Sequence, residues 1–258
     1  MSRYAIECTG IEKTFVQRTI PVTRLQDRIL RFGKTGREIR VEALKPTTVK
    51  IGRGEWIGLY GANGSGKTTF LKLVAGLLKP DRGSVVRHGK MSTFFELGIG
   101  FHPERPAHEN IRLNGLLHGL SSRDIDAMTE RILDFADIGE FADLPLKCYS
   151  TGMRLRLAFA AAAHVEAEIY LFDEIMAVGD ADFQKKCREY LLGLKERGKT
   201  VILVTHNFHQ LCSLVHRVLF FDGGRVTGQR KKICSSDSPE PELVWKLRSD
   251  QTKETVSV

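Results

Sequence analysis

Four short apolar segments, separated by longer amphipathic stretches, dominate the hydrophobic pattern of this chain. They are rich in β-branched and aromatic residues, are bounded by polar residues or glycine, and lie at residues 56–60, 168–172, 200–205 and 216–221. Between the second and third of them, Ala181–Glu196 repeats its apolar positions at helical spacing. Buried strands that alternate with helices predict an α/β fold with a mostly parallel sheet.

Other segments carry different patterns. Polar and apolar positions alternate in residues 4–16, 37–51, 84–88 and 91–95, which predicts antiparallel strands with one face in water. Residues 107–165 contain almost no strand signal, and we expect a helical subdomain inserted between two parts of the α/β core. From Thr227 onward the chain turns polar, which predicts a loose tail over 231–258 with a short helix around Leu243–Leu247.

Length and composition fit a water-soluble globular protein. The 258 residues suffice for one large domain, and 42% of them are hydrophobic. No segment approaches the roughly 20 apolar residues that span a bilayer. The start, MSRYAIEC, lacks the apolar core of a secretory signal, so we expect a cytoplasmic protein. The five cysteines are scattered and form no C-x-x-C pair, which favours reduced thiols over disulfides or zinc ligands.

The charge balance is basic, with a formal net charge of +8. Such a balance attracts nucleic acid or the anionic inner face of a membrane. Much of it gathers between Arg18 and Arg53, where cations far outnumber acids. A run of this kind most often forms a solvated surface, and both interpretations stay open on charge alone.

The strongest chemical signal is a phosphate-binding loop between an apolar segment and a helical one. It comprises Gly61, Ala62, Asn63, Gly64, Ser65, Gly66, Lys67, Thr68 and Thr69. The pattern G-x-x-x-x-G-K-[ST] lets backbone N–H groups turn toward phosphate oxygens, and the helix that follows directs its positive end at the same anion. Lys67 can reach the β- and γ-phosphates, and the Thr68 hydroxyl can bind Mg²⁺.

Three further positions gain meaning only beside this loop. Asp173 and Glu174 follow a buried strand, where Asp173 can hold Mg²⁺ and Glu174 can polarise an attacking water. Tyr149-Ser150-Thr151-Gly152-Met153 precedes a strong helical pattern over Arg154–Val165, and His206 stands between a strand and a helix. Alone, each would be an ordinary strand end, helix cap or structural histidine.

Together these residues resemble the ATP-binding cassette ATPases over roughly residues 4–230. Loop 61–69 is similar to Walker A, Ile169–Glu174 to Walker B with its catalytic glutamate, Ser150–Met153 to the signature motif, Gly179-Asp180-Ala181 to the D-loop, and His206 to the switch histidine. The resemblance implies a RecA-like parallel-sheet core, an antiparallel β-subdomain and a helical signature subdomain. It also implies that ATP and Mg²⁺ bind between two copies in a head-to-tail homodimer.

A narrower resemblance is to the ATPases that export bacterial surface polysaccharides such as O-antigen, capsule and teichoic acid. It rests on three stretches and on the insertion at about residues 21–36; the stretches are residues 95–104, 149–159 and 177–187. The resemblance implies a separate transmembrane permease that handles the polysaccharide. It also implies a peripheral location at the cytoplasmic face of the inner membrane. Within the insertion, residues 22–32 can form an amphipathic helix that either contacts the permease or lipid, or is a solvated surface helix.

Three positions depart from the cassette pattern. Glu96 stands where most cassettes have a glutamine, and its carboxylate can bind Mg²⁺ or water. Thr151 stands where a smaller signature residue is usual. The aromatic residue that stacks on adenine is missing from its expected neighbourhood at residues 40–44, so Tyr4, Phe15 and Phe32 stay open as substitutes.

Two other functions compete with export. A soluble cassette acting on nucleic acid or ribosomes fits the basic charge, but such proteins usually carry two cassettes or long coiled-coil arms, and this chain has one cassette and no sustained heptads. A binding module without turnover would not need Lys67, Asp173, Glu174 and His206 together. We therefore expect an ATPase motor without a nucleic-acid partner.

Overall fold

The computed structural model describes residues 2–18, 38–94, 97–98, 100–173, 179–205 and 207–231. The predicted helices at 22–32 and 243–247 lie outside these residues. In the described part of the chain, no helix is both long and apolar enough to cross a bilayer.

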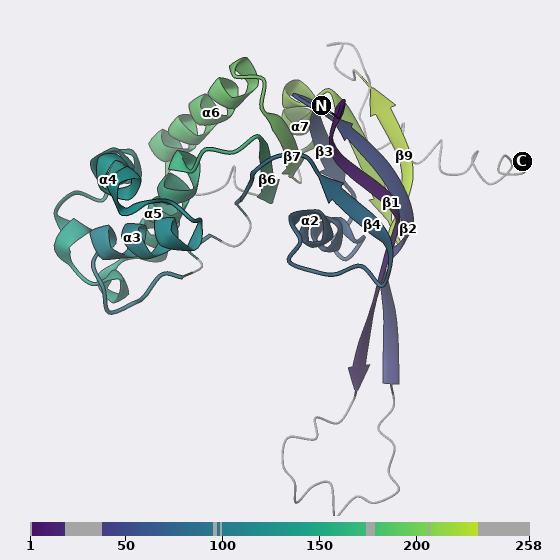
Figure 1. Cartoon of the computed structure of the whole chain (residues 1–258), viewed down its shortest axis with the longest axis horizontal. Coiled ribbons are helices and arrows are strands. Elements are labelled where there is room, and N and C mark those ends of the chain that lie inside the picture. Colours follow the sequence, from purple (N-terminus) through teal and green to yellow (C-terminus); the bar gives the residue numbers. More distant parts are fainter. Residues whose placement is uncertain are drawn as a thin grey trace, which may run out of the picture.

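A six-stranded sheet forms the centre of the molecule, in the order β5-β6-β7-β3-β8-β9 (Figure 1). The first five strands run parallel and β9 runs antiparallel to β8. Their bounds are β3 Trp56–Tyr60, β5 Met91–Thr93, β6 Ile169–Asp173, β7 Thr200–Val204, β8 Arg217–Asp222 and β9 Arg225–Lys231. The predicted α/β class with a mostly parallel sheet is therefore confirmed.

The central strands are apolar throughout because both faces of the sheet are covered. In β7, Ile202 and Val204 pack into one core while Val201 and Leu203 pack into another on the opposite face. Residues of β3, β6 and β8 divide between the same two cores. A strand buried on both faces shows a continuous apolar run instead of alternation, which is why these segments stood out in the sequence.

A second, antiparallel sheet covers one face. It has the order β2-β1-β4 and consists of β1 Tyr4–Arg18, β2 Glu38–Gly52 and β4 Arg82–Arg87. Its buried residues share a core with α2 (Lys67–Ala75), which lies beside it (Figure 1). The antiparallel strands predicted at 4–16, 37–51 and 84–88 are confirmed with small shifts of their ends.

Helices fill the chain between β5 and β6. They are α3 Ala107–Leu117, α4 Ser122–Ala136, two 3₁₀ turns at Gly139–Asp143 and Leu146–Cys148, and α5 Thr151–His164. They enclose a core of their own, set to one side of the sheets in Figure 1. The remaining helices, α6 Ala181–Glu196 and α7 Phe208–Leu214, pack on the sheet face opposite α2.

Both edges of the six-stranded sheet depart from the sequence prediction. The segment at 91–95 was predicted to pair antiparallel and this is wrong, because β5 runs parallel to β6 with Met91 opposite Ile169. Strand β9 was missed, since the chain was expected to be irregular from Thr227. An edge strand has one neighbour and one exposed side, so its sequence carries polar residues that conceal its pairing.

The irregular start of β4, where its register with β1 shifts, supplies a test of this fold. Gly83 has a φ of 78°, and a Cβ there would overlap the carbonyl oxygens of Thr9 and Gly10 on β1. Gly119 has a φ of 75° and open space around it. Gly119→Ala should cost about 1–2 kcal/mol for the left-handed backbone alone. Gly83→Ala should cost roughly 3 kcal/mol or more, because β1 must also move.

Thermal unfolding of both variants measures the difference. For a chain of this size, each kcal/mol lowers Tm by roughly 2–4 °C. Equal Tm values for Gly83→Ala and Gly119→Ala would contradict the close pairing of β1 with β4.

Candidate functional site

The loop between β3 and α2 is pressed against two neighbouring strands. A Cβ on Gly61 would overlap the Phe221 carbonyl oxygen at the end of β8. Gly66 has a φ of 105°, and a Cβ there would lie 2.6 Å from the Ala43 carbonyl oxygen. Ala43 falls at a register shift between β1 and β2, a bulge that re-aims the backbone of β2. Both glycines are therefore required by the packing of this chain.

The start of α2 is arranged for an anion. Gly66 occupies the N-cap without a side-chain cap, and the first turn contains no acidic residue. The backbone N–H groups of this turn and the helix dipole therefore favour a negative charge. Ala62, Asn63 and Gly64 are exposed at the tip of the loop, and Thr69 is half-buried.

Lys67 places an ammonium inside the loop. Its side chain is buried, and its Nζ donates to the carbonyl oxygens of Gly61 at 2.7 Å and Ala62 at 2.9 Å. Ser65 lies beneath the same turn, where its backbone N–H donates to the Ala62 carbonyl. Among the described residues its buried Oγ has no hydrogen-bond partner. The loop thus gathers a cation and N–H donors around one point.

Thr68 and Asp173 meet although they are far apart in sequence. The Thr68 Oγ1 donates to Asp173 Oδ2 at 3.1 Å. The contact forms because β3 and β6, separated only by β7, end at the same edge of the sheet. A hydroxyl and a carboxylate are hard oxygen donors of the kind Mg²⁺ prefers alongside phosphate and water. In the described ranges no group of three or more His, Cys, Asp or Glu is placed to hold a metal ion.

The segment Ser150–Met153 forms the first turn of α5, three residues before the predicted helix start. Ser150 is the N-cap, and its Oγ accepts from the Met153 N–H at 3.1 Å. The preceding Tyr149 is buried and donates its hydroxyl to the Phe141 carbonyl at 2.7 Å, and burial raises its pKa to about 12. A Cβ on Gly152 would meet only Ser150 Oγ, at 3.8 Å. None of the described residues requires glycine there, in contrast to Gly61 and Gly66.

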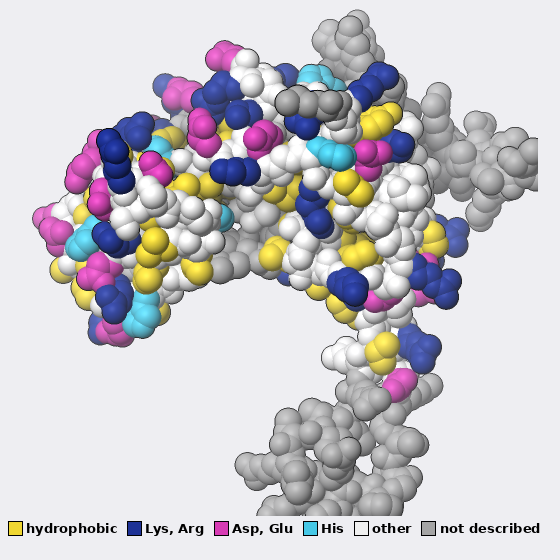
Figure 2. All heavy atoms as spheres, in the orientation of Figure 1, with side chains coloured by type: hydrophobic (Ala, Val, Ile, Leu, Met, Phe, Trp, Pro, Cys, Tyr) yellow, Lys and Arg dark blue, Asp and Glu magenta, His cyan; other side chains and the backbone are white. Residues whose placement is uncertain are grey.

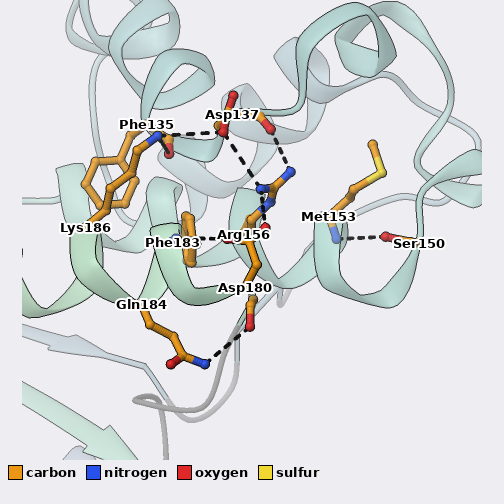
Figure 3. Close-up of polar contacts among 10 residues, drawn as sticks. Phe135, Asp137, Ser150, Met153, Arg156, Asp180, Phe183, Gln184 and Lys186 are labelled. Atoms are coloured by element: carbon orange, nitrogen blue, oxygen red, sulfur yellow. Dashed lines mark hydrogen bonds and ion pairs between the residues drawn. The ribbon is translucent and has the colours of Figure 1, made fainter.

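Asp180 caps a different helix. Its Oδ1 accepts from the Phe183 N–H at 2.9 Å at the start of α6 (Figure 3). Its Oδ2 faces the Arg156 guanidinium of α5 at 3.4 Å. The turns that carry Ser150 and Asp180 are therefore linked within one chain.

The phosphate loop and the Ser150 turn lie in different parts of the molecule. Figure 1 shows α5 among the helices on one side and α2 beside the antiparallel sheet on the other. One copy of the chain therefore does not bring Ser150 and Gly152 to its own Lys67.

Three predicted site residues, Glu96, Glu174 and His206, lie outside the described residues. The structure describes their neighbours. Asp173 pairs with Val204 across adjacent strands, and the Asn207 N–H donates to Thr205 Oγ1 at 3.2 Å. The last described residues before Glu174 and His206 therefore lie close together at one edge of the sheet.

The pairing of β1 with β2 distinguishes among the aromatic residues that are candidates for stacking on adenine. Phe15 is 40% exposed and lies opposite Val41, two residues before the Ala43 carbonyl that abuts the phosphate loop. Tyr4 pairs with Gly52 at the other end of β2, and Phe32 lies outside the described residues. Residues 40–44 contain no aromatic side chain, and the strand register brings Phe15 to that place from the neighbouring strand.

Comparison with known proteins identifies the family. The family model described as ABC transporter matches residues 44–177, just over half of the chain. The fold is similar to that of the ATP-binding cassette MJ0796, solved as a dimer in a post-hydrolysis state bound to ADP and Pi. The TM-score is 0.69 at 24% identity, with 89% of this chain and all of that chain covered.

Curated relatives include ATP-binding proteins of polysaccharide export systems. The O-antigen export protein RfbB of Klebsiella pneumoniae is 41% identical over 71% of this chain and 75% of its own length. RfbB of Myxococcus xanthus is 38% identical over 86% of this chain, and the teichoic acids export protein TagH of Lactiplantibacillus plantarum is 42% identical over 72%. The chain spans about half the length of these last two, 52% and 51%. These matches, together with the phosphate loop and its Thr68–Asp173 contact, show that the chain belongs to the ABC transporter family.

Proposed function

We propose that this chain is the ATP-binding and ATP-hydrolysing motor subunit of an ABC transporter that exports a surface polysaccharide. The main evidence for the ATP site is the phosphate loop together with the hydrogen bond from the Thr68 hydroxyl to Asp173. The proposal that the exported substrate is a polysaccharide rests on the relatives, which are named for O-antigen and teichoic acid export.

The nucleotide's phosphates would bind the loop 61–69. Backbone N–H groups and Lys67 would neutralise the β- and γ-phosphates. Thr68 and Asp173 would hold Mg²⁺ against them, with Glu96 as a further ligand. When bound, the metal would polarise the phosphate oxygens and compensate the negative charge that develops on them.

Hydrolysis would depend on residues at the ends of β6 and β7. Glu174 would accept a proton from the attacking water, and His206 would contact the γ-phosphate. Lys67 would stabilise charge on the transferred group. The pairing of Asp173 with Val204 supports these roles, because it sets the ends of the two strands next to each other, directly before Glu174 and shortly before His206.

The second half of the site would come from another copy. In a head-to-tail homodimer, the first turn of α5 would meet the nucleotide held by the partner's loop, with Ser150 and Gly152 N–H groups as donors and Asp180 at the interface. The open space around Gly152 supports this proposal. Glycine also occurs where a ligand approaches the backbone closely, and in the proposed dimer that ligand would be the partner's nucleotide.

A separate transmembrane permease would carry the polysaccharide, with this subunit bound peripherally at the cytoplasmic face of the membrane. Leu116 and Leu117 at the end of α3 are 48% and 67% exposed and offer an apolar contact. On the face in Figure 2, Lys and Arg side chains are interspersed with Asp and Glu, which suits a protein partner better than nucleic acid. The cassette would occupy residues 1–230, with 107–165 as its helical subdomain and 231–258 as a tail.

Glu174→Gln should bind ATP with affinity near that of the parent but lose at least about 100-fold in kcat, because an amide cannot accept the proton from the attacking water. ATP should then hold two copies together. Steady-state phosphate release and sedimentation with and without ATP measure both effects.

Glu130→Gln is the matched control, since Glu130 is exposed on α4 and the substitution is the same. It should hydrolyse ATP like the parent. Glu174→Gln turnover at the parent rate would show that Glu174 is not the general base.

Phe15→Ala should weaken ATP binding by roughly tenfold, since stacking on a base is worth about 1–3 kcal/mol. Phe15→Tyr should retain the affinity. Val16→Ala is the control, because Val16 is exposed next to Phe15 on the opposite face of the ribbon. Titration with a fluorescent ATP analogue gives each Kd, and equal Kd values for Phe15→Ala and Val16→Ala would exclude stacking by Phe15.

A further inference from the structure

Arg156 lies where three helices of the chain come together. It belongs to α5, one and a half turns after the Ser150 cap, and its side chain is only 17% exposed. Its guanidinium reaches the end of α4 on one side and the start of α6 on the other (Figure 3). None of the roles proposed above uses this residue.

The contact with α4 is made to the backbone. Arg156 Nη2 donates to the Asp137 carbonyl at 2.7 Å, which satisfies an acceptor that the end of α4 leaves without a helical partner. Asp137 has a φ of 52° and is the one non-glycine residue with a positive φ in the described part of the chain. The Asp137 carboxylate lies 3.9 Å from both Arg156 and Lys186 of α6. The end of α4 is therefore fixed to α5.

The contact with α6 is made through the Asp180 carboxylate, whose two oxygens have different partners. One oxygen of Asp180 caps α6 at the Phe183 N–H, and the other faces Arg156 at 3.4 Å. The guanidinium also lies over the Phe183 ring, 5.9 Å from its centroid. A planar guanidinium can serve a carbonyl, a carboxylate and a ring at once, which a lysine ammonium cannot.

The two contacts differ in strength. The Asp137 carbonyl bond is short and its donor is largely buried, whereas Asp180 is 64% exposed and its ion pair is longer. Solvent screens an exposed pair and leaves it worth little. The Asp137 carbonyl bond is therefore the firmer of the two contacts, and it holds the guanidinium in the place where Asp180 meets it.

We propose that Arg156 is a positioning residue that sets the Ser150 turn and the Asp180 turn in one relation, so that both meet the nucleotide of a second copy together. This rests on the proposed function, in which the two turns form half of a shared ATP site. Arg156 itself touches no nucleotide in this arrangement. Its loss should leave the phosphate loop intact and impair the joining of two copies.

The test uses Arg156→Met. Methionine keeps much of the side-chain length and the apolar contact with Phe183 but removes the forked N–H donors of the guanidinium. The Kd of a fluorescent ATP analogue for the monomer should change less than twofold. In a Glu174→Gln background, ATP-dependent dimerisation should weaken at least tenfold, and with Glu174 intact kcat should fall at least tenfold. Arg156→Lys should recover only part of the dimerisation and of kcat, because lysine supplies the positive charge without the forked N–H donors.

Arg188→Met is the matched control: Arg188 is exposed on α6, and among the described residues no ion pair involves it. It should behave as the parent. Asp180→Asn keeps the helix cap and removes the charge, so Arg156→Met combined with Asp180→Asn should lose little more than Arg156→Met alone.

Several outcomes would overturn the proposal. Arg156→Met could lower Tm while dimerisation and kcat per folded molecule stay at parent values, which would make its role purely structural. Equal losses of monomer ATP affinity and kcat would place its effect on the phosphate loop. Additive losses in the double variant would exclude action through Asp180. Failure of the parent and Arg188→Met to dimerise or hydrolyse ATP would instead refute the proposed function.

Discussion

The site depends on the close packing of the loop after β3 between two neighbouring strands. The Phe221 carbonyl at the end of β8 and the Ala43 carbonyl at a bulge in β2 leave no room for side chains at Gly61 and Gly66. With side chains excluded, the N–H groups of the loop and of the start of α2 would form the surface that binds phosphate. The antiparallel sheet is therefore a wall of the nucleotide site as well as a cover for the core.

The same packing explains how distant residues reach the loop. The parallel strands end at one edge of the sheet, so Asp173 at the end of β6 reaches Thr68 on α2, and the end of β7 lies beside Asp173. Strands β6 and β7 are buried on both faces, and the carboxyl ends of such strands commonly carry binding and catalytic residues. In the proposed mechanism, the metal ligand Asp173 and the catalytic base Glu174 would stand at the end of such a strand.

The helical part follows a different design. Its core is separate from the two cores of the sheet, and polar contacts of Arg156 tie its last helix to α4 and α6. Apolar packing fixes each part internally, while a screened ion pair joins the Ser150 turn to the Asp180 turn. In the proposed dimer, this contact would hold the two turns in one relation as they meet the second copy.

Local sequence determined the features that depend on near neighbours along the chain. The sequence predicted the continuous apolar runs of β6 and β7, the apolar stripe of α6 and the loop with Lys67 and Thr68. Burial on two faces, helical periodicity and left-handed glycines each restrict which residues can occur at a position, so these features can be recognised from the local sequence. Tertiary structure decided the rest. The parallel pairing of β5, the existence of β9, the approach of Phe15 to the loop through Val41 and the meeting of Arg156 with Asp137 and Asp180 all join residues distant in sequence. Edge strands and polar junctions are selected for partial exposure, so their residues resemble ordinary surface until the fold places their partners beside them.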